Sequence, residues 1–491
     1  MRPPARTAVL RRIVLSPLTP LLVSMLFSMW RLSNQSLWAD EGETFGAALY
    51  RLQPYEHPST YFRFVGLWMR WFGSTEFLLR LPSALSAAGL VLVALGAGRF
   101  FEIPRLGLWA AWLAALSPFV RLGAQEARMY APMAFTQAAA LWGLLSYLNG
   151  NRRGAYVWAA GTGVSTALHH LGWLACWPLW VAALCFSRTR RPLILAGLLA
   201  FGLYAPLLVP TASQVLFRLH GGHMGSTPSF LAAGKKLLGH VYYLGAGYLF
   251  TRLDGDSLLA LLRSPKAAVF LLQLMIPAVL AVRGSVRLWA TARRRTGLLA
   301  AFFLPTFLFL GYEGSPANLL LPVYLAYLIP LAAGAATTRP MWVVAMLLLW
   351  APAHVRQIES SGYLLHPEDW RGMAENIRES STSDDAVFLT GSRNSLFMAD
   401  YYPMDPARRH SAVDSARAHA PFDAHLPLGG PGIVSVVDSL LSAYSRVWFV
   451  HLDWDMPSME RSVDTLWIRS GRWRRRFGEG LELIRLERGA P

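Results

Sequence analysis

Acidic side chains with a histidine beside them follow the first apolar run of the sequence. The segment LWADEGETFGAALYRLQPYEHPSTYF contains Asp40, Glu41, Glu43, Glu56 and His57. A carboxylate can deprotonate an attacking hydroxyl group when it reaches the proton, and Asp, Glu and His together can bind a divalent cation. The same spacing also suits a structural role, in which Asp40 or Glu41 occupies the first turn of a helix over 42–52. These residues are therefore candidates for a general base, a metal ligand or a helix cap.

A second polar group lies in the segment QEARMYAP, between two apolar runs. It contains Gln125, Glu126, Arg128 and Tyr130. The Arg128 guanidinium can bind two phosphate oxygens at once, and the Tyr130 hydroxyl can form a hydrogen bond at a membrane interface. Arg and Tyr are also frequent at the ends of membrane helices, where they only anchor the helix. The segment therefore predicts either a phosphate-binding site or an interfacial anchor.

Two adjacent histidines, His169 and His170, interrupt a long apolar stretch. Such a pair can supply a metal ligand or a general base, or it can form an ordinary polar turn between two helices. The apolar runs on either side are so close together that they require a tight turn at these two residues.

The elements that must position these residues are membrane helices. Apolar residues make up 54% of the 491 residues and occur in long blocks separated by arginine-rich gaps. Because about 20 apolar residues cross a bilayer core, the sequence predicts a polytopic membrane helix bundle, mainly α, with about 11 transmembrane helices. We place them at 13–30, 80–98, 105–121, 130–149, 154–168, 170–186, 191–212, 264–283, 297–312, 318–336 and 340–354. The segment 237–250 is apolar but short, and we expect it to be interfacial or re-entrant.

The arginine-rich gaps predict the orientation of the chain in the membrane. With these spans, the gaps fall on one side: Arg11 and Arg12, Arg99 and Arg105, Arg152 and Arg153, Arg188, Arg190 and Arg191, Arg293 to Arg295, and Arg339. The positive-inside rule makes that side, and the N-terminus, cytoplasmic. The outer side then holds loops 31–79 and 213–263, the turn at 122–129, the histidine pair and the tail.

The last third of the chain has the pattern of a soluble domain. The segments AVFLT (386–390), RVWFV (446–450) and LELIRL (481–486) have the composition of strands, and residues 368–380 have that of a helix. The sequence therefore predicts a transmembrane domain over 1–356, which includes the two outer loops, and a small extracytoplasmic α/β domain over 357–491.

Charge and cysteine content exclude other classes of protein. The formal net charge of +17 does not indicate a nucleic-acid partner, because much of it is arginine at the ends of apolar blocks. The two cysteines, Cys176 and Cys185, lie in one apolar block, so the sequence offers neither a disulfide framework nor a zinc finger.

The order of the polar motifs resembles that of a known family. The run DEGETF, YEHPSTYFRFVGLWMRWFG, EFLLRLPSAL and SPFVRLGAQEARMYAPMA is similar to the bacterial family 39 glycosyltransferases, which are related to the protein O-mannosyltransferases and the lipid A aminoarabinose transferase. The resemblance is densest over residues 37–148. It continues more loosely in HHLGWL (169–174) and in PEDWRGMAENIRESSTSDDAVFL (367–389).

The resemblance implies the GT-C membrane fold, a bacterial inner-membrane location, and transfer of a sugar from a polyprenyl-phosphate donor to a lipid, glycan or protein acceptor outside the membrane. It implies that Asp40 and Glu41 match the family's acidic pair, with Asp40 as the usual candidate base. Glu56 matches the acid of the family's E-x-P segment, and Arg128 matches the arginine of its A-R-M-Y segment. His57 stands where relatives often carry Lys or His, as a phosphate contact. We expect Gln125, Glu126, Tyr130, His169 and His170 to bind substrate. A divalent metal ion is a further expectation.

Two rival functions follow from the same sequence. A lipid or sugar transporter or flippase would also be polytopic. Inverted repeats in a transporter would show paired Gly/Pro-broken spans, and the sequence shows no such pair. Charged residues inside the spans are also few, so no proton relay is visible. A non-catalytic assembly subunit would not need acids and Arg128 on the same side of the membrane. We therefore expect a membrane glycosyltransferase.

Overall fold

A computed structural model of the whole chain describes residues 16–52, 57–209, 212, 230–246, 263, 266–313, 317–359, 368–389, 393–404, 408–411, 430–452, 474–477 and 481–487. The chain forms two compact units. The helical unit comprises Met1–Trp30, Glu56–Tyr61 and Arg80–Arg356, and the sheet unit comprises Arg31–Tyr55, Phe62–Leu79 and Gln357–Pro491. We describe each unit by itself.

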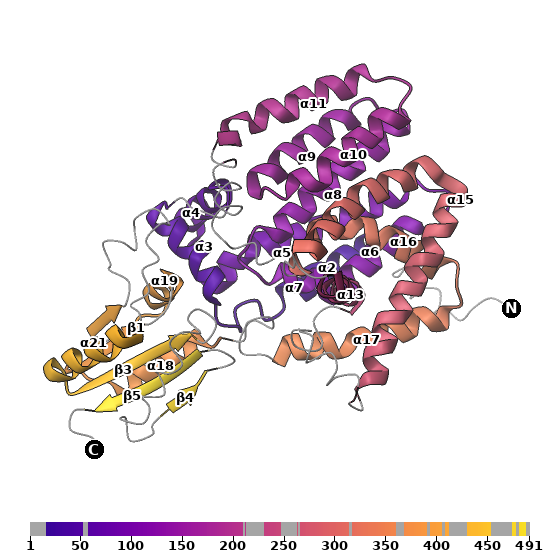
Figure 1. Cartoon of the computed structure of the whole chain (residues 1–491). Helices are drawn as coiled ribbons and strands as arrows, with labels where there is room; N and C mark the ends of the chain where they lie inside the picture. The colour runs from indigo at the N-terminus through magenta and orange to yellow at the C-terminus, as the bar shows by residue number, and fades with distance from the viewer. Residues whose placement is uncertain are drawn as a thin grey trace. The chain divides into compact units, whose positions relative to one another are not determined.

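The helical unit is built from apolar helices (Figure 1). They are α2 (Leu18–Met29), α5 (Glu76–Gly98, whose first turn belongs to the sheet unit), α6 (Leu106–Leu116), α7 (Pro118–Ala124), α8 (Tyr130–Leu148), α9 (Gly154–Leu168), α10 (Gly172–Phe186), α11 (Arg191–Tyr204), α13 (Phe230–Ala246), α15 (Ala267–Glu313), α16 (Tyr324–Ala336) and α17 (Pro340–Glu359), with 3₁₀ turns η1 (Ala205–Leu207) and η2 (Ala317–Val323). The mainly α prediction is confirmed.

The lengths of the apolar helices support a membrane protein. Among the described residues, 3 helices are long and apolar enough to cross a bilayer: Glu76–Gly98, Ala267–Gly311 and Leu319–Ala336. A fourth span results if α6 and α7, which meet at an angle of 58°, count as one. Other apolar helices, such as α2 and α10, are shorter. The number of about 11 spans therefore stays a prediction.

Three of the predicted spans have different boundaries in the structure. The segment 105–121 is broken, because Pro118 starts the new helix α7 and the Ser117 hydroxyl accepts a hydrogen bond from the Val120 N–H, as at a helix N-terminus. The predicted spans 264–283 and 297–312 run together as α15, in which two helices meet at a kink at Ala292 (φ −142°, ψ 50°). The break predicted between the two spans is therefore this kink, with Arg293 to Arg295 directly after it, and not a longer loop.

Close helix packing in the helical unit depends on small residues. A Cβ atom at Gly284 of α15 would clash with the Pro330 carbonyl of α16, and one at Gly334 of α16 would clash with the Leu280 carbonyl of α15. Because neither glycine has a side chain, the two backbones approach closely, as small residues allow in membrane helix pairs. The segment predicted to be re-entrant, 237–250, contributes to helix α13 as far as Ala246.

The sheet unit is an α/β domain. Its strands are β1 (Asp385–Leu389), β2 (Arg408–Ser411), β3 (Arg446–Leu452), β4 (Arg474–Arg476) and β5 (Leu481–Glu487), in the order β2-β1-β3-β5-β4. Strand β1 runs parallel to β2 and β3, whereas β5 runs antiparallel to β3 and β4. Phe388, Phe449 and Ile484 lie in the buried core beside helix α21 (Gly430–Ala443). The three predicted strands are therefore confirmed.

Helices from both ends of the chain belong to this unit. The predicted helix at 368–380 is confirmed as α18 (Trp370–Ser380), which begins where Asp369 accepts a hydrogen bond from the Gly372 N–H. Helix α19 (Arg393–Tyr401) packs on α3 (Ala39–Tyr50), which belongs to the first long loop. The loop 31–79 also contains α4 (Thr60–Phe72), most of which belongs to the sheet unit.

Candidate functional site

A cluster of arginine and histidine side chains lies buried in the helical unit. Arg128, in the turn between α7 and α8, is only 2% exposed. Its Nη2 atom lies 3.2 Å from Nε2 of His57. Because a guanidinium has donors only, it donates this hydrogen bond and His57 accepts it. We call Arg128, His57, His169 and His170 the Arg–His cluster.

The three histidines of the cluster lie against one another. The ring centroids of His57 and His169 are 5.0 Å apart, and those of His169 and His170 are 4.3 Å apart. One ligand atom from each of the three residues lies within 4.8 Å of the others. The cluster thus joins a residue of the first loop to the histidine pair, which lies more than a hundred residues further along the chain.

Local geometry explains why the histidine pair points into the cluster. Helix α9 ends at Leu168, and His169 is extended (φ −158°, ψ 138°). The turn is closed by a 3.0 Å hydrogen bond from the Gly172 N–H to the His169 carbonyl. A side chain at Gly172 would press on the backbone of Thr166, so glycine allows the return of the chain. The predicted tight turn is confirmed.

The cluster offers the donor atoms of a metal site, but two of them already have partners. The Nε2 lone pair of His57 accepts from Arg128, and the Nδ1 lone pair of His169 accepts from the Leu171 N–H at 3.0 Å. In a neutral imidazole the second nitrogen then carries the proton. Three imidazoles suit Zn²⁺, yet an ion would have to displace one of these hydrogen bonds. The predicted metal therefore stays a prediction.

The other residues of the QEARMYAP segment take different positions. The Tyr130 ring lies 6.2 Å from the His169 ring, so it borders the cluster. Glu126 is fully buried. Gln125 instead donates to the Trp30 carbonyl at 3.2 Å. A 3.1 Å hydrogen bond from the Ser83 hydroxyl to the Arg128 carbonyl ties the segment to α5.

The predicted acids of the first loop lie on α3 in the sheet unit. Glu41 is fully buried, and its carboxylate accepts a hydrogen bond from the Trp38 N–H at 3.3 Å. This bond caps the start of α3, so the structural role considered for Glu41 is present. Asp40 is partly exposed in the same first turn, and Glu43 is buried. Glu56 lies outside the described residues.

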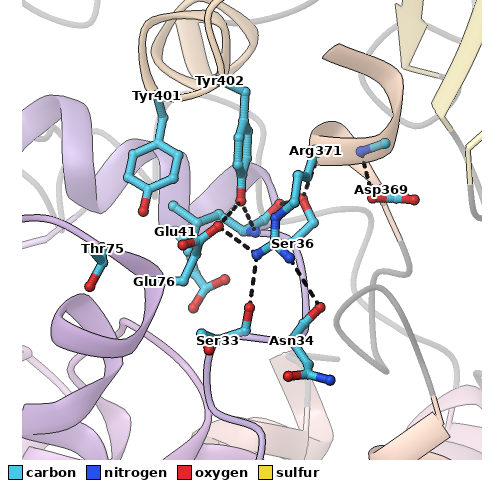
Figure 2. Close-up of polar contacts among 12 residues, drawn as sticks. Ser33, Asn34, Ser36, Glu41, Thr75, Glu76, Asp369, Arg371, Tyr401 and Tyr402 are labelled. Carbon is cyan, nitrogen blue, oxygen red and sulfur yellow. Dashed lines mark hydrogen bonds and ion pairs between the residues drawn. The ribbon is translucent and has the colours of Figure 1, made fainter. Parts of the chain in front are cut away.

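The sequence reasoning missed an ionic network in the sheet unit. Figure 2 shows the Glu76 carboxylate between the Arg371 guanidinium, at 2.5 Å, and the Tyr402 hydroxyl, at 3.0 Å. Arg371 also donates to the Ser33 carbonyl at 2.8 Å, and the Tyr402 hydroxyl accepts from the Leu37 N–H at 2.9 Å. Burial, and then the nearby Glu76 carboxylate, raise the pKa of Tyr402, so its hydroxyl keeps the proton it donates.

This network borders a cavity of about 480 Å³ in the sheet unit. Tyr401 lines the cavity, but its hydroxyl donates to the Ser74 carbonyl at 2.8 Å and its ring meets Phe45 edge-on. Tyr401 and Tyr402 thus form part of the packing of the unit. Their spacing in the sequence carried too little signal to predict this. A second missed residue is Arg80, a fully buried charge on the apolar helix α5, which its position in EFLLRLPSAL could have indicated.

Comparison with known proteins identifies solved structures that have a similar fold. No family model matches the sequence, and no curated protein matches it. The structure is similar to that of apo ArnT from Cupriavidus metallidurans, with a TM-score of 0.59 and 12% identity over 98% of each chain. ArnT bound to undecaprenyl phosphate gives a TM-score of 0.55, with 12% identity over 99% of each chain.

A third similar structure is the oligosaccharyltransferase of Archaeoglobus fulgidus in complex with Zn and sulfate, with a TM-score of 0.54 and 13% identity over 88% of this chain and 67% of the other. At such low identity these likenesses establish the fold alone. The chain has the GT-C fold that the sequence motifs implied.

Proposed function

We propose that this protein is a membrane glycosyltransferase that moves a sugar from a polyprenyl-phosphate donor to an acceptor on the outer face of the membrane. The observation that carries the proposal is the buried pair of Arg128 and His57 in a chain with the GT-C fold. The guanidinium is a bidentate phosphate ligand. One structure similar over almost the whole chain was crystallised with undecaprenyl phosphate.

The proposed reaction is a single displacement at the anomeric carbon. The acceptor oxygen attacks that carbon while the bond from carbon to the phosphate oxygen breaks, and its electron pair leaves with the polyprenyl phosphate. Arg128, with His57 beside it, stabilises the charge that grows on the leaving phosphate. Asp40 takes the proton of the acceptor hydroxyl. The configuration at the anomeric carbon is inverted.

The remaining candidates have supporting roles in this proposal. Tyr130, His169 and His170 line the phosphate end of the site beside Arg128. Glu41 holds the start of α3, and therefore the neighbouring Asp40, through its bond to Trp38. Glu56 remains a candidate catalytic acid. A bound divalent cation at the three histidines would add positive charge near the phosphate.

A transfer assay tests the proposal. Purified protein in detergent is incubated with a radiolabelled polyprenyl-phosphate sugar and a membrane extract as the source of acceptor. We expect label to pass from the donor into acceptor material, and Arg128→Ala to abolish the transfer. The exposed Arg152→Ala is the matched control and should transfer normally. With the protein reconstituted in vesicles, movement of intact labelled donor across the membrane without transfer would instead identify a flippase.

A further inference from the structure

A second cavity lies in the helical unit, and its lining includes no residue of the Arg–His cluster. Its volume is about 540 Å³. It is lined by the C-terminal end of α8, the turn after α10, the kink of α15 and Glu102 from the turn before α6. In the sequence analysis each of these turns belongs to the arginine-rich side of the membrane. The predicted topology therefore puts the cavity at the level of the lipid headgroups on that side.

The charge of the cavity is strongly positive. Its lining includes Arg188, Arg293, Arg294 and Arg295, against the single described acid Glu102. Arg188, Arg293 and Arg294 are exposed, whereas Arg295 is half-buried. Four guanidinium groups gathered around one cavity favour a ligand with phosphate oxygens.

Hydrogen bonds hold the turns around the cavity in place. Arg295 donates to the Phe100 carbonyl and, at 2.7 Å, to Oδ1 of Asn149, so one side chain ties together three separate turns. The Tyr147 hydroxyl donates to the Thr189 carbonyl at 2.5 Å, which fixes the turn that carries Arg188. The cavity is thus assembled from anchored segments.

The kink of α15 places apolar and basic surfaces next to each other. Helix α15 exposes Val282, Val286 and Trp289 along one face before the kink at Ala292, with exposed fractions of 64%, 66% and 49%. The arginines follow directly, and the Arg293 guanidinium lies 5.1 Å from the Trp289 ring centroid. The change of direction is visible in Figure 1. A molecule with both an acyl chain and a phosphate matches the apolar face and the arginines together, whereas a soluble phosphate matches only the arginines.

We propose that this cavity binds the headgroup phosphate of an anionic glycerophospholipid of the phosphatidylglycerol type, with its acyl chains along the exposed face of α15. Basic cavities between membrane helices on the cytoplasmic side recognise such headgroups. Arg188 and Arg294 contact the phosphate, and Arg295 keeps the turns in position. This site is separate from sugar transfer and does not depend on the proposed function.

The test compares two double variants of the full chain. Arg188→Ala with Arg294→Ala removes two exposed arginines of the cavity. Arg152→Ala with Arg153→Ala removes two exposed arginines from a neighbouring turn on the same predicted side. The two double variants therefore lose the same charge. Each purified protein is titrated with phosphatidylglycerol, phosphatidylcholine and inorganic phosphate, and bound lipid is counted by native mass spectrometry. Thermal melting without lipid checks that each variant is folded.

We expect the unaltered protein to bind phosphatidylglycerol in preference to phosphatidylcholine, and the cavity variant to bind it about tenfold more weakly or worse. The control variant should keep its affinity. Equal weakening of both double variants would show that only overall charge matters and would overturn the proposal. Binding of inorganic phosphate as tightly as of the lipid would also overturn it, since the acyl chains would then contribute nothing.

Discussion

At the scale of single residues, the chemistry of Arg128 depends on its fork of donors. The guanidinium is buried beside His57, and a phosphate there would be bound through two parallel hydrogen bonds. A lysine keeps the positive charge but loses that geometry. We expect Arg128→Lys to lower kcat/KM by about tenfold or more, measured by donor titration in the transfer assay. Arg152→Lys is the exposed control, and full activity of Arg128→Lys would reduce Arg128 to an anchor.

Asp40 is the residue whose predicted role is most easily separated from folding. It is partly exposed in the first turn of α3, whereas its neighbour Glu41 is fully buried and caps the helix. Asp40→Asn removes the charge and keeps the shape, so we expect about a 10²–10⁴-fold loss of transfer with donor affinity nearly unchanged. This corresponds to roughly 3–5 kcal/mol in the barrier. Asp438→Asn, on the exposed side of α21, serves as the control. Activity within threefold of the unaltered protein would remove Asp40 from the mechanism.

At the scale of elements, the pair of Glu76 and Arg371 joins the start of α5 to α18 within the sheet unit. Glu76 is 16% exposed and Arg371 is 32% exposed, so the pair is partly shielded from water. Arg371→Ala leaves the carboxylate with fewer partners. We expect a loss of about 1–3 kcal/mol, seen as a lower melting temperature in detergent.

The same helix provides the control for this pair. Arg378 of α18 lies 4.0 Å from Glu375, and both are exposed, so Arg378→Ala should change stability little. Combining Arg371→Ala with Glu76→Gln should cost less than the sum of the two single changes, because each removes the same interaction. Simple additivity would show that the two side chains are not coupled.

At the scale of the whole molecule, the orientation in the membrane can be measured directly. Single cysteines are introduced at exposed positions in a chain with Cys185→Ser, since Cys176 is buried. Positions 51 and 375 should react with an impermeant reagent from outside, and positions 152 and 294 only after the membrane is opened. Labelling of position 375 from the cytoplasm would contradict the predicted topology and, with it, the proposed outer site.

Removal of the C-terminal tail should disturb the first long loop, because both belong to the sheet unit. Helix α3 packs against α19, where the Phe397 ring lies beside Gly46 and Tyr401 meets Phe45 at 4.9 Å. Removing residues 360–491 would expose this face of α3. We therefore expect the truncated protein to melt at a lower temperature and to transfer sugar poorly. If the tail folded and functioned independently, its removal would leave both properties unchanged. A truncated chain with an unchanged melting temperature would show that α3 does not need the tail.

Properties set by short stretches of the chain could be predicted from the sequence. Apolar blocks identified a mainly α membrane protein, because the lipid requires long helices with internally bonded backbones. Short segments with the composition of strands located them at 386–390, 446–450 and 481–486, and the order of polar motifs indicated the GT-C fold. The histidine turn followed from the short distance between its flanking runs.

Only the tertiary structure could decide how residues far apart in the chain meet. It joined His57 to Arg128 and His169, and it paired Glu76 with Arg371, since such contacts depend on packing between elements and leave no periodic pattern in the sequence. It also placed Arg293 to Arg295 directly after a kink between two helices that run together as α15, where the sequence indicated a loop. Hydropathy responds to charge but cannot distinguish a charged loop from a charged, bent helix, because both expose arginine to water.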